Sequence, residues 1–431
     1  MKIADTTDDA AERLASKPNL IGMTRDELAQ ALKPLGIEPF RSKQIWQWLY
    51  GKGVTDFALM SNIARPVQEK LAEHFTIARA GISRNAVSFD ETQKWLLKFA
   101  DQNEVETVFI PESNRGTLCV SSQVGCTLAC TFCHTGTQRL VRNLTAGEII
   151  TQVLVARDGL NEWPGRGVLH QAAIPAGTPP GTVYVPLKHE PGQPEHNKGA
   201  TTNLSPSAAK RKKMYAANPE NEARQLSNIV FMGMGEPLFN YDNVVKACQI
   251  MMDGEGLKLS RRKITVSTSG VVPKIVPLAK DAGVNLAISL HAVNDDLRNE
   301  IVPINRKYPI AELLEAVREY QSIVSDRHIM FEYVMLQGVN DSEADAREMV
   351  RLLKGIRSKV NLIPFNPWPG APYTCSSNNR IHAFGRIIME AGIAAPIRKT
   401  RGEDIMAACG QLKSMSELKK GQKVTGLNKR P

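Results

Sequence analysis

Short apolar runs alternate with longer stretches of helical periodicity between residues 116 and 400. Runs rich in apolar and β-branched residues predict strands, here at residues 117–121, 229–232, 264–267, 285–290, 329–335 and 360–364. Amphipathic stretches that predict helices lie between most of them, at residues 146–157, 242–252, 310–324 and 342–353. Alternating strands and helices build right-handed βαβ units around a parallel sheet. The pattern therefore predicts an α/β protein with an open, partial (βα)6 barrel at residues 116–400.

Residues 1–75 and 76–115 depart from this alternation, and we assign them to separate units. Thr24, followed by Asp26 and Glu27, is typical of a helix N-terminus, and leucines follow at helical spacing. This predicts a small N-terminal helical domain. Basic and aromatic residues mix at residues 41–50. The basic residues could contact an RNA backbone, which would make this an RNA-docking domain, and a purely structural domain is the alternative. Residues 76–115 alternate apolar and polar positions, which predicts short antiparallel strands.

Two further segments stand outside the barrel pattern. Residues 161–225 hold nine of the chain's 25 prolines and many small polar residues, a composition that cannot pack a core. We expect a flexible, proline-rich insertion there. Its basic run at residues 210–213 is either solvated or in contact with RNA. Residues 401–431 carry the last cysteine and a basic tail.

The charge balance of the chain favours a polyanionic partner. The formal net charge of the 431 residues is +10, and such an excess attracts nucleic acids, although many basic proteins bind no polyanion. No apolar run approaches the length of a membrane helix, and residues 1–9 lack the apolar core of a secretory signal. Seven unevenly spaced cysteines argue against a disulfide framework. We expect a cytoplasmic protein with no membrane partner.

Three of those cysteines form the most informative motif in the chain. Cys126, Cys130 and Cys133 follow a C-x3-C-x2-C pattern, with an aromatic residue directly before the last cysteine. Three thiolates on one loop can hold three irons of a 4Fe–4S cluster, which leaves the fourth iron open to a small molecule. Zinc bound with His134 and three ordinary buried cysteines are the alternatives. Structural zinc sites usually consist of two separated ligand pairs, and no second pair is present in this sequence.

The cysteine spacing is characteristic of the radical S-adenosylmethionine (SAM) superfamily, and other motifs resemble one family within it. These motifs are residues 118–126, Gly233-Met234-Gly235-Glu236-Pro237, Ser289-Leu290-His291 and residues 361–367, 398–402 and 407–412. They resemble the bacterial dual-specificity RNA methyltransferases, which make 2-methyladenosine in 23S rRNA and in a subset of tRNAs. The resemblance covers residues 21–415. It implies a radical SAM barrel with a 4Fe–4S cluster on the three motif cysteines; the long insertion is the departure.

The resemblance also implies how carbon 2 of adenine is methylated, although that carbon is electron-poor and is not a nucleophile. Two SAM molecules are used per turnover. The first methylates Cys409, and the second is cleaved to a 5′-deoxyadenosyl radical that takes a hydrogen from the S-methyl group. The resulting radical adds to the base and leaves an RNA–protein thioether, which Cys119 resolves through a disulfide. Glu106 matches the family's proton acceptor; without the resemblance it would be an ordinary strand glutamate.

SAM itself needs partners at the carboxyl ends of the barrel strands, where barrel ligands bind. The positions that match the family's SAM contacts are Gly235, Glu236, Ser267, Ser289, Leu290, His291 and Asn366. Glu236 would accept from the amino group of SAM, and the adjacent glycines would let the backbone approach the ligand. Taken alone, His291 is as easily a packed histidine. We also expect a monomer that receives electrons from a donor such as flavodoxin.

Other functions share parts of this pattern. Methylation at carbon 8 of adenine, a sister activity that confers antibiotic resistance, uses the same cluster and cysteine pair. An activase that takes hydrogen from a protein glycine would not need Cys119 and Cys409 together. A non-catalytic Fe–S or zinc RNA-binding module would bind no SAM, and the motifs at Gly235-Glu236 and Ser289-Leu290-His291 argue against it.

Overall fold

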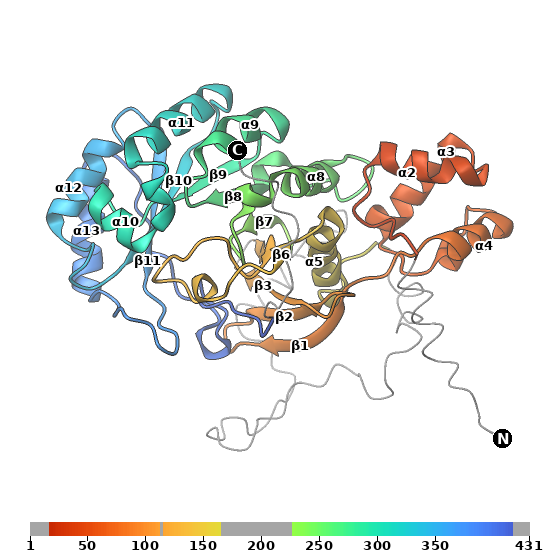
Figure 1. Ribbon diagram of the computed structural model, residues 1–431, viewed down its shortest axis with the longest axis horizontal. Helices are drawn as coiled ribbons and strands as arrows, with labels where there is room; N and C mark the ends of the chain where they lie inside the picture. The colour runs from red at the N-terminus through yellow and green to blue at the C-terminus, as the bar shows by residue number, and fades with distance from the viewer. Residues whose placement is uncertain (1–16, 113–114, 165–225, 417–431) are drawn as a thin grey trace, which may run out of the picture.

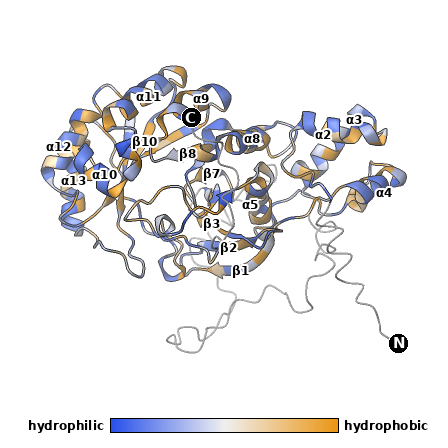
Figure 2. Ribbon diagram, viewed as in Figure 1, coloured by the Kyte–Doolittle hydropathy of each residue, from blue (hydrophilic) through white to orange (hydrophobic). Residues whose placement is uncertain are grey.

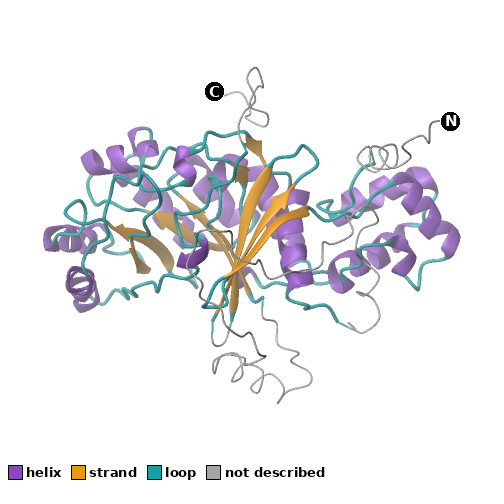
Figure 3. Cartoon of the chain, turned by 90° about the horizontal axis from the view of Figure 1, so that it is seen from below, coloured by secondary structure: helices purple, strands orange, loops and turns teal. Residues whose placement is uncertain are grey.

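A computed structural model describes residues 17–112, 115–164 and 226–416 of the chain. Its main feature is one nine-stranded sheet with the strand order β1-β2-β3-β4-β7-β8-β9-β10-β11. Helices cover this sheet, and three N-terminal helices form a lobe at one end of the molecule (Figures 1 and 3). No helix in the described part of the chain is long and apolar enough to cross a membrane.

The six strands from β4 to β11 are parallel and form the predicted open barrel. They are β4 (Gly116–Cys119), β7 (Asn228–Phe231), β8 (Ile264–Thr268), β9 (Asn285–Ser289), β10 (Ile329–Met335) and β11 (Ser358–Pro364). Each lies within two residues of its predicted position at both ends. Every residue of β8 is buried, as expected for a strand with both faces covered. The partial (βα)6 barrel is therefore confirmed.

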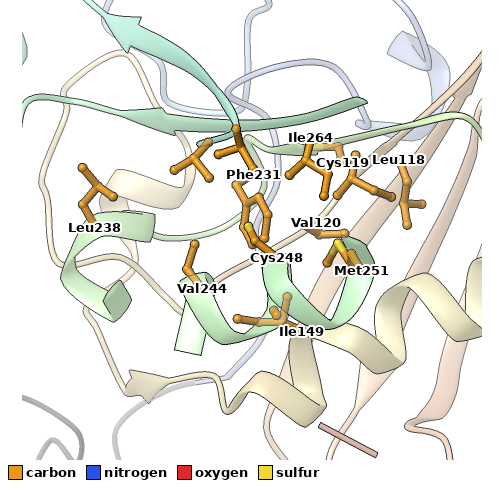
Figure 4. Close-up of a cluster of buried hydrophobic side chains, with 14 of the residues drawn as sticks. Leu118, Cys119, Val120, Ile149, Phe231, Leu238, Val244, Cys248, Met251 and Ile264 are labelled. Carbon is orange, nitrogen blue, oxygen red and sulfur yellow. The ribbon is translucent and has the colours of Figure 1, made fainter. Parts of the chain in front are cut away.

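Helices follow the strands and pack on the outer side of the sheet. They are α5 (Ala146–Gly159), α8 (Tyr241–Met252), α9 (Ile275–Asp281), α10 (Asp295–Ile301), α11 (Ile310–Ile323), α12 (Glu343–Leu352) and α13 (Asn378–Glu390). Hydrophobic residues concentrate on the central strands, and the outward turns of the helices are hydrophilic (Figure 2). One local core joins β4, β7 and β8 to α5 and α8 (Figure 4). Cys248 on α8 is fully buried in it and belongs to the core.

Helix α5 differs from the amphipathic helix that its sequence predicts, because it is buried on almost every side. The antiparallel strands and the N-terminal lobe cover the face that would otherwise meet water. A Cβ atom on Gly22 would lie 2.3 Å from the Cα of Gly147, and one on Gly159 would lie 3.1 Å from the Trp95 ring. These glycines let the chain of the lobe and the strand β2 approach the helix closely.

The expected antiparallel strands extend the barrel sheet. They are β1 (Gly81–Val87), β2 (Gln93–Lys98) and β3 (Glu104–Pro111), and β3 pairs antiparallel with β4. A second, two-stranded sheet, β5 (Gln123–Val124) with β6 (Arg142–Asn143), flanks the loop that carries the cysteine motif. The antiparallel strands thus bring residues of β2 and β3 next to the first barrel strand.

The N-terminal lobe contains α2 (Arg25–Leu32), α3 (Pro39–Trp46) and α4 (Arg65–His74). Thr24 forms a capping box with Glu27, as its sequence predicts. The Trp46 Nε1–H donates to Asp253 Oδ1 at 3.0 Å, and Lys43 pairs with Glu255 at 3.0 Å, so the lobe is bonded to the segment after α8. Most of the predicted insertion lies outside the described residues. Its first four residues, 161–164, are described. Among them Trp163 is buried, and the Arg157 guanidinium lies over its ring at 4.2 Å.

The contact between Gly53 and Trp163 gives a test of this packing. Gly53 has φ +70°, and a Cβ atom there would lie 2.2 Å from the Trp163 ring. We expect Gly53→Ala to lower the free energy of unfolding by about 1–3 kcal/mol, because it combines backbone strain with overpacking. Thermal unfolding should show a melting point lower by about 1 °C per kcal/mol for a chain of this length. The control Gly254→Ala places its added Cβ in open space, so its melting point should stay close to that of the wild-type protein. If Gly53→Ala also melted at the wild-type temperature, the described contact would be contradicted.

Candidate active site

A cavity opens at the carboxyl ends of the barrel strands and is bounded on one side by the cysteine loop. Nine of the thirteen predicted site residues line it, namely Cys126, Cys130, Cys133, Gly235, Glu236, Ser267, Ser289, His291 and Cys409. The other four, Cys119, Glu106, Leu290 and Asn366, do not line it and are described below. The fold thus brings together residues that are up to 283 positions apart in the sequence.

The cysteine loop is held by tight backbone turns. Gly125 has φ +74°, and a Cβ atom there would lie 2.1 Å from the Arg139 carbonyl oxygen. The Cys133 amide donates to the Cys130 carbonyl at 3.1 Å. Burial, reinforced by repulsion from Cys133 and Glu236, raises the pKa of Cys130 to about 12, and burial also raises the pKa values of Cys126 and Cys133. Coordination to a metal ion would deprotonate these thiols despite the raised pKa values.

The zinc alternative does not fit this loop. In the part of the chain that the structure describes, no three His, Cys, Asp or Glu side chains converge on the position of one ion. His134, the fourth ligand of that alternative, stacks on Trp368 at 4.8 Å and lies with Nδ1 3.2 Å from the Gln411 carbonyl oxygen. Cys126, Cys130 and Cys133 all line the cavity, as three thiolates that hold one cubane cluster would.

Glu236 lies at the turn that follows β7, with its side chain buried at the cavity. Its carboxylate accepts hydrogen bonds from the Ser269 amide at 2.8 Å and the Leu238 amide at 3.1 Å. Burial raises its pKa, and these bonds oppose that shift. The glycines before it have a structural role beside the predicted one. A Cβ atom on Gly233 would lie 2.7 Å from the Val120 carbonyl oxygen, and one on Gly235 would lie 2.5 Å from Gln123 Cβ.

His291 presents a defined hydrogen-bond donor to the cavity. It has φ +60°, and its Nδ1 accepts a hydrogen bond from the Val334 amide at 3.1 Å. Burial lowers its pKa to about 3, so the ring is neutral and its proton is on Nε2. Ser267 and Ser289 lie beside it at the ends of β8 and β9, with their hydroxyl oxygens 3.5 Å apart. Together these groups can bind the hydroxyls or ring nitrogens of a nucleoside.

Residues 406–416, which we call the C-terminal segment, return across the cysteine loop and place Cys409 at the cavity. The His134 amide donates to the Gly410 carbonyl at 2.7 Å, and the Asn366 side-chain amide donates to the Cys409 carbonyl at 3.2 Å. Residue Cys409 as a whole is exposed. Desolvation of its thiol raises the pKa, and the charge of Arg398 opposes that shift. Arg401, in the same motif, pairs with Asp90 at 3.6 Å.

Cys119 is buried at the end of β4, close enough to Cys409 for their charges to interact. Burial raises the pKa of Cys119 above its ordinary range, and a charge on Cys409 would raise it further. All seven cysteines lie in the described ranges and have free thiols. The two cysteines that the resemblance pairs therefore lie near enough to affect each other electrostatically, and their roles stay predictions.

The three remaining predicted residues lie just outside the cavity. Leu290 is fully buried and binds only through its backbone, with its amide donating to the Glu332 carbonyl at 3.1 Å. Asn366 binds the backbone of the C-terminal segment. Glu106 on β3 pairs with Lys94 at 2.7 Å and accepts from the Lys413 amide at 2.9 Å. Their assigned roles toward SAM and toward the proton stay predictions.

Similarity to known proteins decides the family. Residues 18–77 match the ribosomal RNA large subunit methyltransferase N-terminal domain, and residues 198–350 match the radical SAM superfamily. The dual-specificity RNA methyltransferase RlmN of Rhodospirillum rubrum is 51% identical over 398 residues, which cover 92% of this chain and 81% of that protein. RlmN of Acidiphilium cryptum is 52% identical over 398 residues, covering 92% and 89%. This chain belongs to the RlmN family.

A solved structure supports the same placement. The crystal structure of a radical SAM methyltransferase from Sphaerobacter thermophilus is 38% identical, with a TM-score of 0.74, and the match covers 92% of this chain and 99% of that one. The chain is therefore a radical SAM RNA methyltransferase, and the superfamily uses a 4Fe–4S cluster and SAM. Cys126, Cys130 and Cys133 are the residues of this RlmN-family protein that fit the cluster.

Sequence reasoning missed two charged residues of this RlmN-family site. Glu332 lines the cavity and accepts a hydrogen bond from the Asn361 side-chain amide at 2.7 Å. Its position as a carboxylate within an apolar strand could have indicated a site residue from the sequence. Arg298 on α10 is fully buried and gave no signal, since it lies in a polar helix. Its guanidinium donates to the carbonyl oxygens of Ser269, Ser289 and Leu290 at 2.8–3.1 Å and to Asn305 Oδ1 at 2.7 Å. Arg298 therefore joins the ends of β8 and β9 behind the cavity.

Replacing Arg298 tests this role. Arg298→Met leaves three buried carbonyl groups without their donor, each at a cost of about 1–3 kcal/mol. We expect the free energy of unfolding to fall by about 3–5 kcal/mol and SAM affinity to fall by about tenfold, because the strand ends that carry Ser267 and Ser289 lose their link. Thermal unfolding and calorimetric SAM titration measure the two effects. The control Arg318→Met, on the exposed face of α11, should change neither; unchanged SAM affinity in a folded Arg298→Met protein would contradict the role.

Proposed function

We propose that this enzyme methylates carbon 2 of an adenosine in 23S rRNA and in a subset of tRNAs, using two SAM molecules per turnover. The observation that carries the proposal is the place of Cys409 at the cavity that the three motif cysteines also line, with the buried Cys119 near enough for their charges to interact. The relatives are named dual-specificity RNA methyltransferases, which supports the RNA substrates. A simple SAM-dependent transfer to a nucleophile would need no such cysteine pair.

The groups needed to hold the cofactors are present in this chain. Cys126, Cys130 and Cys133 would hold three irons of the 4Fe–4S cluster, and Glu236 would accept from the amino group of SAM. When bound, the cluster supplies the electron that cleaves SAM to a carbon radical. Ser267, Ser289 and the Nε2–H of His291 would orient the nucleoside part of SAM. These side chains come from the ends of separate strands, so the ligand is fixed from several sides.

Cys409 and Cys119 would carry the methyl group and release the product. The Cys409 sulfur accepts a methyl group from one SAM, and the positive charge of Arg398 favours the thiolate that this step needs. After loss of a hydrogen atom, the methylene radical on Cys409 adds to carbon 2 of adenine. The adduct then loses the proton of carbon 2 and one electron, which the oxidised cluster would accept. The Cys119 thiolate then attacks the Cys409 sulfur, the carbon–sulfur bond breaks, and a disulfide remains for an external thiol to reduce. When the carbon–sulfur bond breaks, its electron pair stays on the methylene carbon, which takes up a proton and becomes the methyl group.

We propose that Glu106 takes the proton from carbon 2. Lys94 favours the carboxylate form of Glu106 that this step needs. Burial raises the pKa of Glu106, and the Lys94 ammonium at 2.7 Å opposes that shift and favours the carboxylate. The target base must leave its stack to reach the cavity, which single-stranded or loop RNA makes easier. The N-terminal lobe, whose family model is named for rRNA methyltransferases, is proposed to dock the RNA.

Product analysis tests the reaction. Cluster-reconstituted enzyme is incubated anaerobically with protein-free 23S rRNA, SAM and a reductant, and the digested nucleosides are identified by mass spectrometry. We expect 2-methyladenosine, reduced at least about a hundredfold in Cys409→Ala because the methyl carrier is absent. The control Cys375→Ala, a loop cysteine outside the cavity, should retain the activity. Formation of 8-methyladenosine would instead establish the sister activity, and no methylated adenosine despite SAM cleavage would refute the substrate.

The role of Cys119 has a separate test. Cys119→Ala should stop after the base has bonded to Cys409, because no thiolate remains to break the carbon–sulfur bond. We expect a protein–RNA band that survives denaturing electrophoresis and disappears after ribonuclease treatment. The double variant Cys119→Ala/Cys409→Ala should give no such band. Turnover by Cys119→Ala at the wild-type rate would assign resolution to another group.

A further inference from the structure

A buried ion pair on the antiparallel strands holds the chain on both sides of Cys409. Lys94 on β2 and Glu106 on β3 lie on the same face of the sheet, with Nζ and Oε1 2.7 Å apart. Only 12% of the Lys94 side chain and 9% of the Glu106 side chain is exposed. Charges so buried need further hydrogen bonds, and here the C-terminal segment provides them.

The two bonds bracket the catalytic cysteine. Lys94 Nζ donates to the Met406 carbonyl at 3.0 Å, three residues before Cys409. Glu106 Oε2 accepts from the Lys413 amide at 2.9 Å, four residues after it. Met406 has φ +53°, a left-handed conformation that is unfavourable for a side chain of its size and persists only where surrounding contacts impose it. The bond from Lys94 is one of those contacts.

Other bonds to the segment come from the opposite direction. His134 in the cysteine loop and Asn366 after β11 bind the carbonyl groups of Gly410 and Cys409. Without the pair on β2 and β3, the segment would keep these bonds and the bond from the Glu104 amide of β3 to the Ser416 hydroxyl. It would lose the two bonds that lie nearest to Cys409 on the side of the antiparallel strands. The sulfur of Cys409 must be in place for methyl transfer, for attack on the base and for attack by Cys119. A displacement of about 1 Å is enough to cost on the order of a hundredfold in rate.

We propose that Lys94 is a positioning residue, which forms with Glu106 a clamp that fixes the Cys409 sulfur over the cavity. This Lys94–Glu106 clamp rests on the proposed function of Cys409 and adds to it. Lys94 has a structural reason to be a cation, because a neutral side chain would leave the buried Glu106 carboxylate without its partner. Glu106 likewise gains a role that is separate from proton transfer.

The test combines local exchange with coupling of the reaction. Lys94→Met is compared with Lys98→Met, which removes an exposed lysine from the same strand. Hydrogen–deuterium exchange of the holoenzyme, followed by peptide mass spectrometry, should be about tenfold faster in Lys94→Met across residues 403–416 and unchanged in α11 and α12. The yield of methylated adenosine per 5′-deoxyadenosine released should fall about tenfold. Lys98→Met should alter neither, and Lys94→Arg should restore part of the protection.

A second variant covers a failure to fold. Lys94→Met/Glu106→Gln removes both charges and leaves no unpaired carboxylate, and its segment should also exchange about tenfold faster. Wild-type exchange across residues 403–416 in a folded variant would overturn the clamp, as would faster exchange throughout the protein, which would indicate a general loss of stability. A wild-type enzyme that makes no methylated adenosine would instead refute the proposed function. The exchange measurement still decides the clamp in that case.

Discussion

The return of the C-terminal segment to the cysteine loop is the contact on which the site depends. The bond from the His134 amide to the Gly410 carbonyl joins two parts of the chain that are separated by five of the six barrel strands. Because the parallel strands all point their carboxyl ends to one side, the cavity lies where this segment crosses. The barrel supplies the ligand-binding side chains, and the segment supplies the sulfur that would react. Neither part makes a complete site alone.

Much of the fold follows from the sequence because its signals are local. The six barrel strands are apolar runs bounded by polar residues, and each is found within two residues of its predicted place. The amphipathic prediction for α5 was wrong for a reason that lies elsewhere in the chain. Periodicity indicates which face of a helix is most apolar, and it does not reveal that Gly22 and Trp95 bring further layers against the remaining faces.

Only part of the site could be predicted from local sequence patterns. The spacing of Cys126, Cys130 and Cys133 indicates a cluster by itself, since few other structures require three thiols on one loop. Cys119, Cys409 and Asn366 carry no such local pattern, and only the resemblance joined them. Arg298 could not be found, because its function is to bind backbone carbonyls that any sequence would present. Glu332 could have been found, since a carboxylate inside an apolar strand needs a reason.

The hydrogen bond between Glu162 and Leu226 has a consequence for how this chain can vary. The Leu226 amide donates to Glu162 Oε1 at 2.6 Å, so the two ends of the segment between them are already fixed side by side. With the ends held by the barrel, the free energy of closing the connection grows only with the logarithm of its length, about 0.6 kcal/mol for each doubling. Insertions and deletions in this connection therefore change the stability of the sheet very little. This connection is the natural place in the chain to insert a label or a foreign domain.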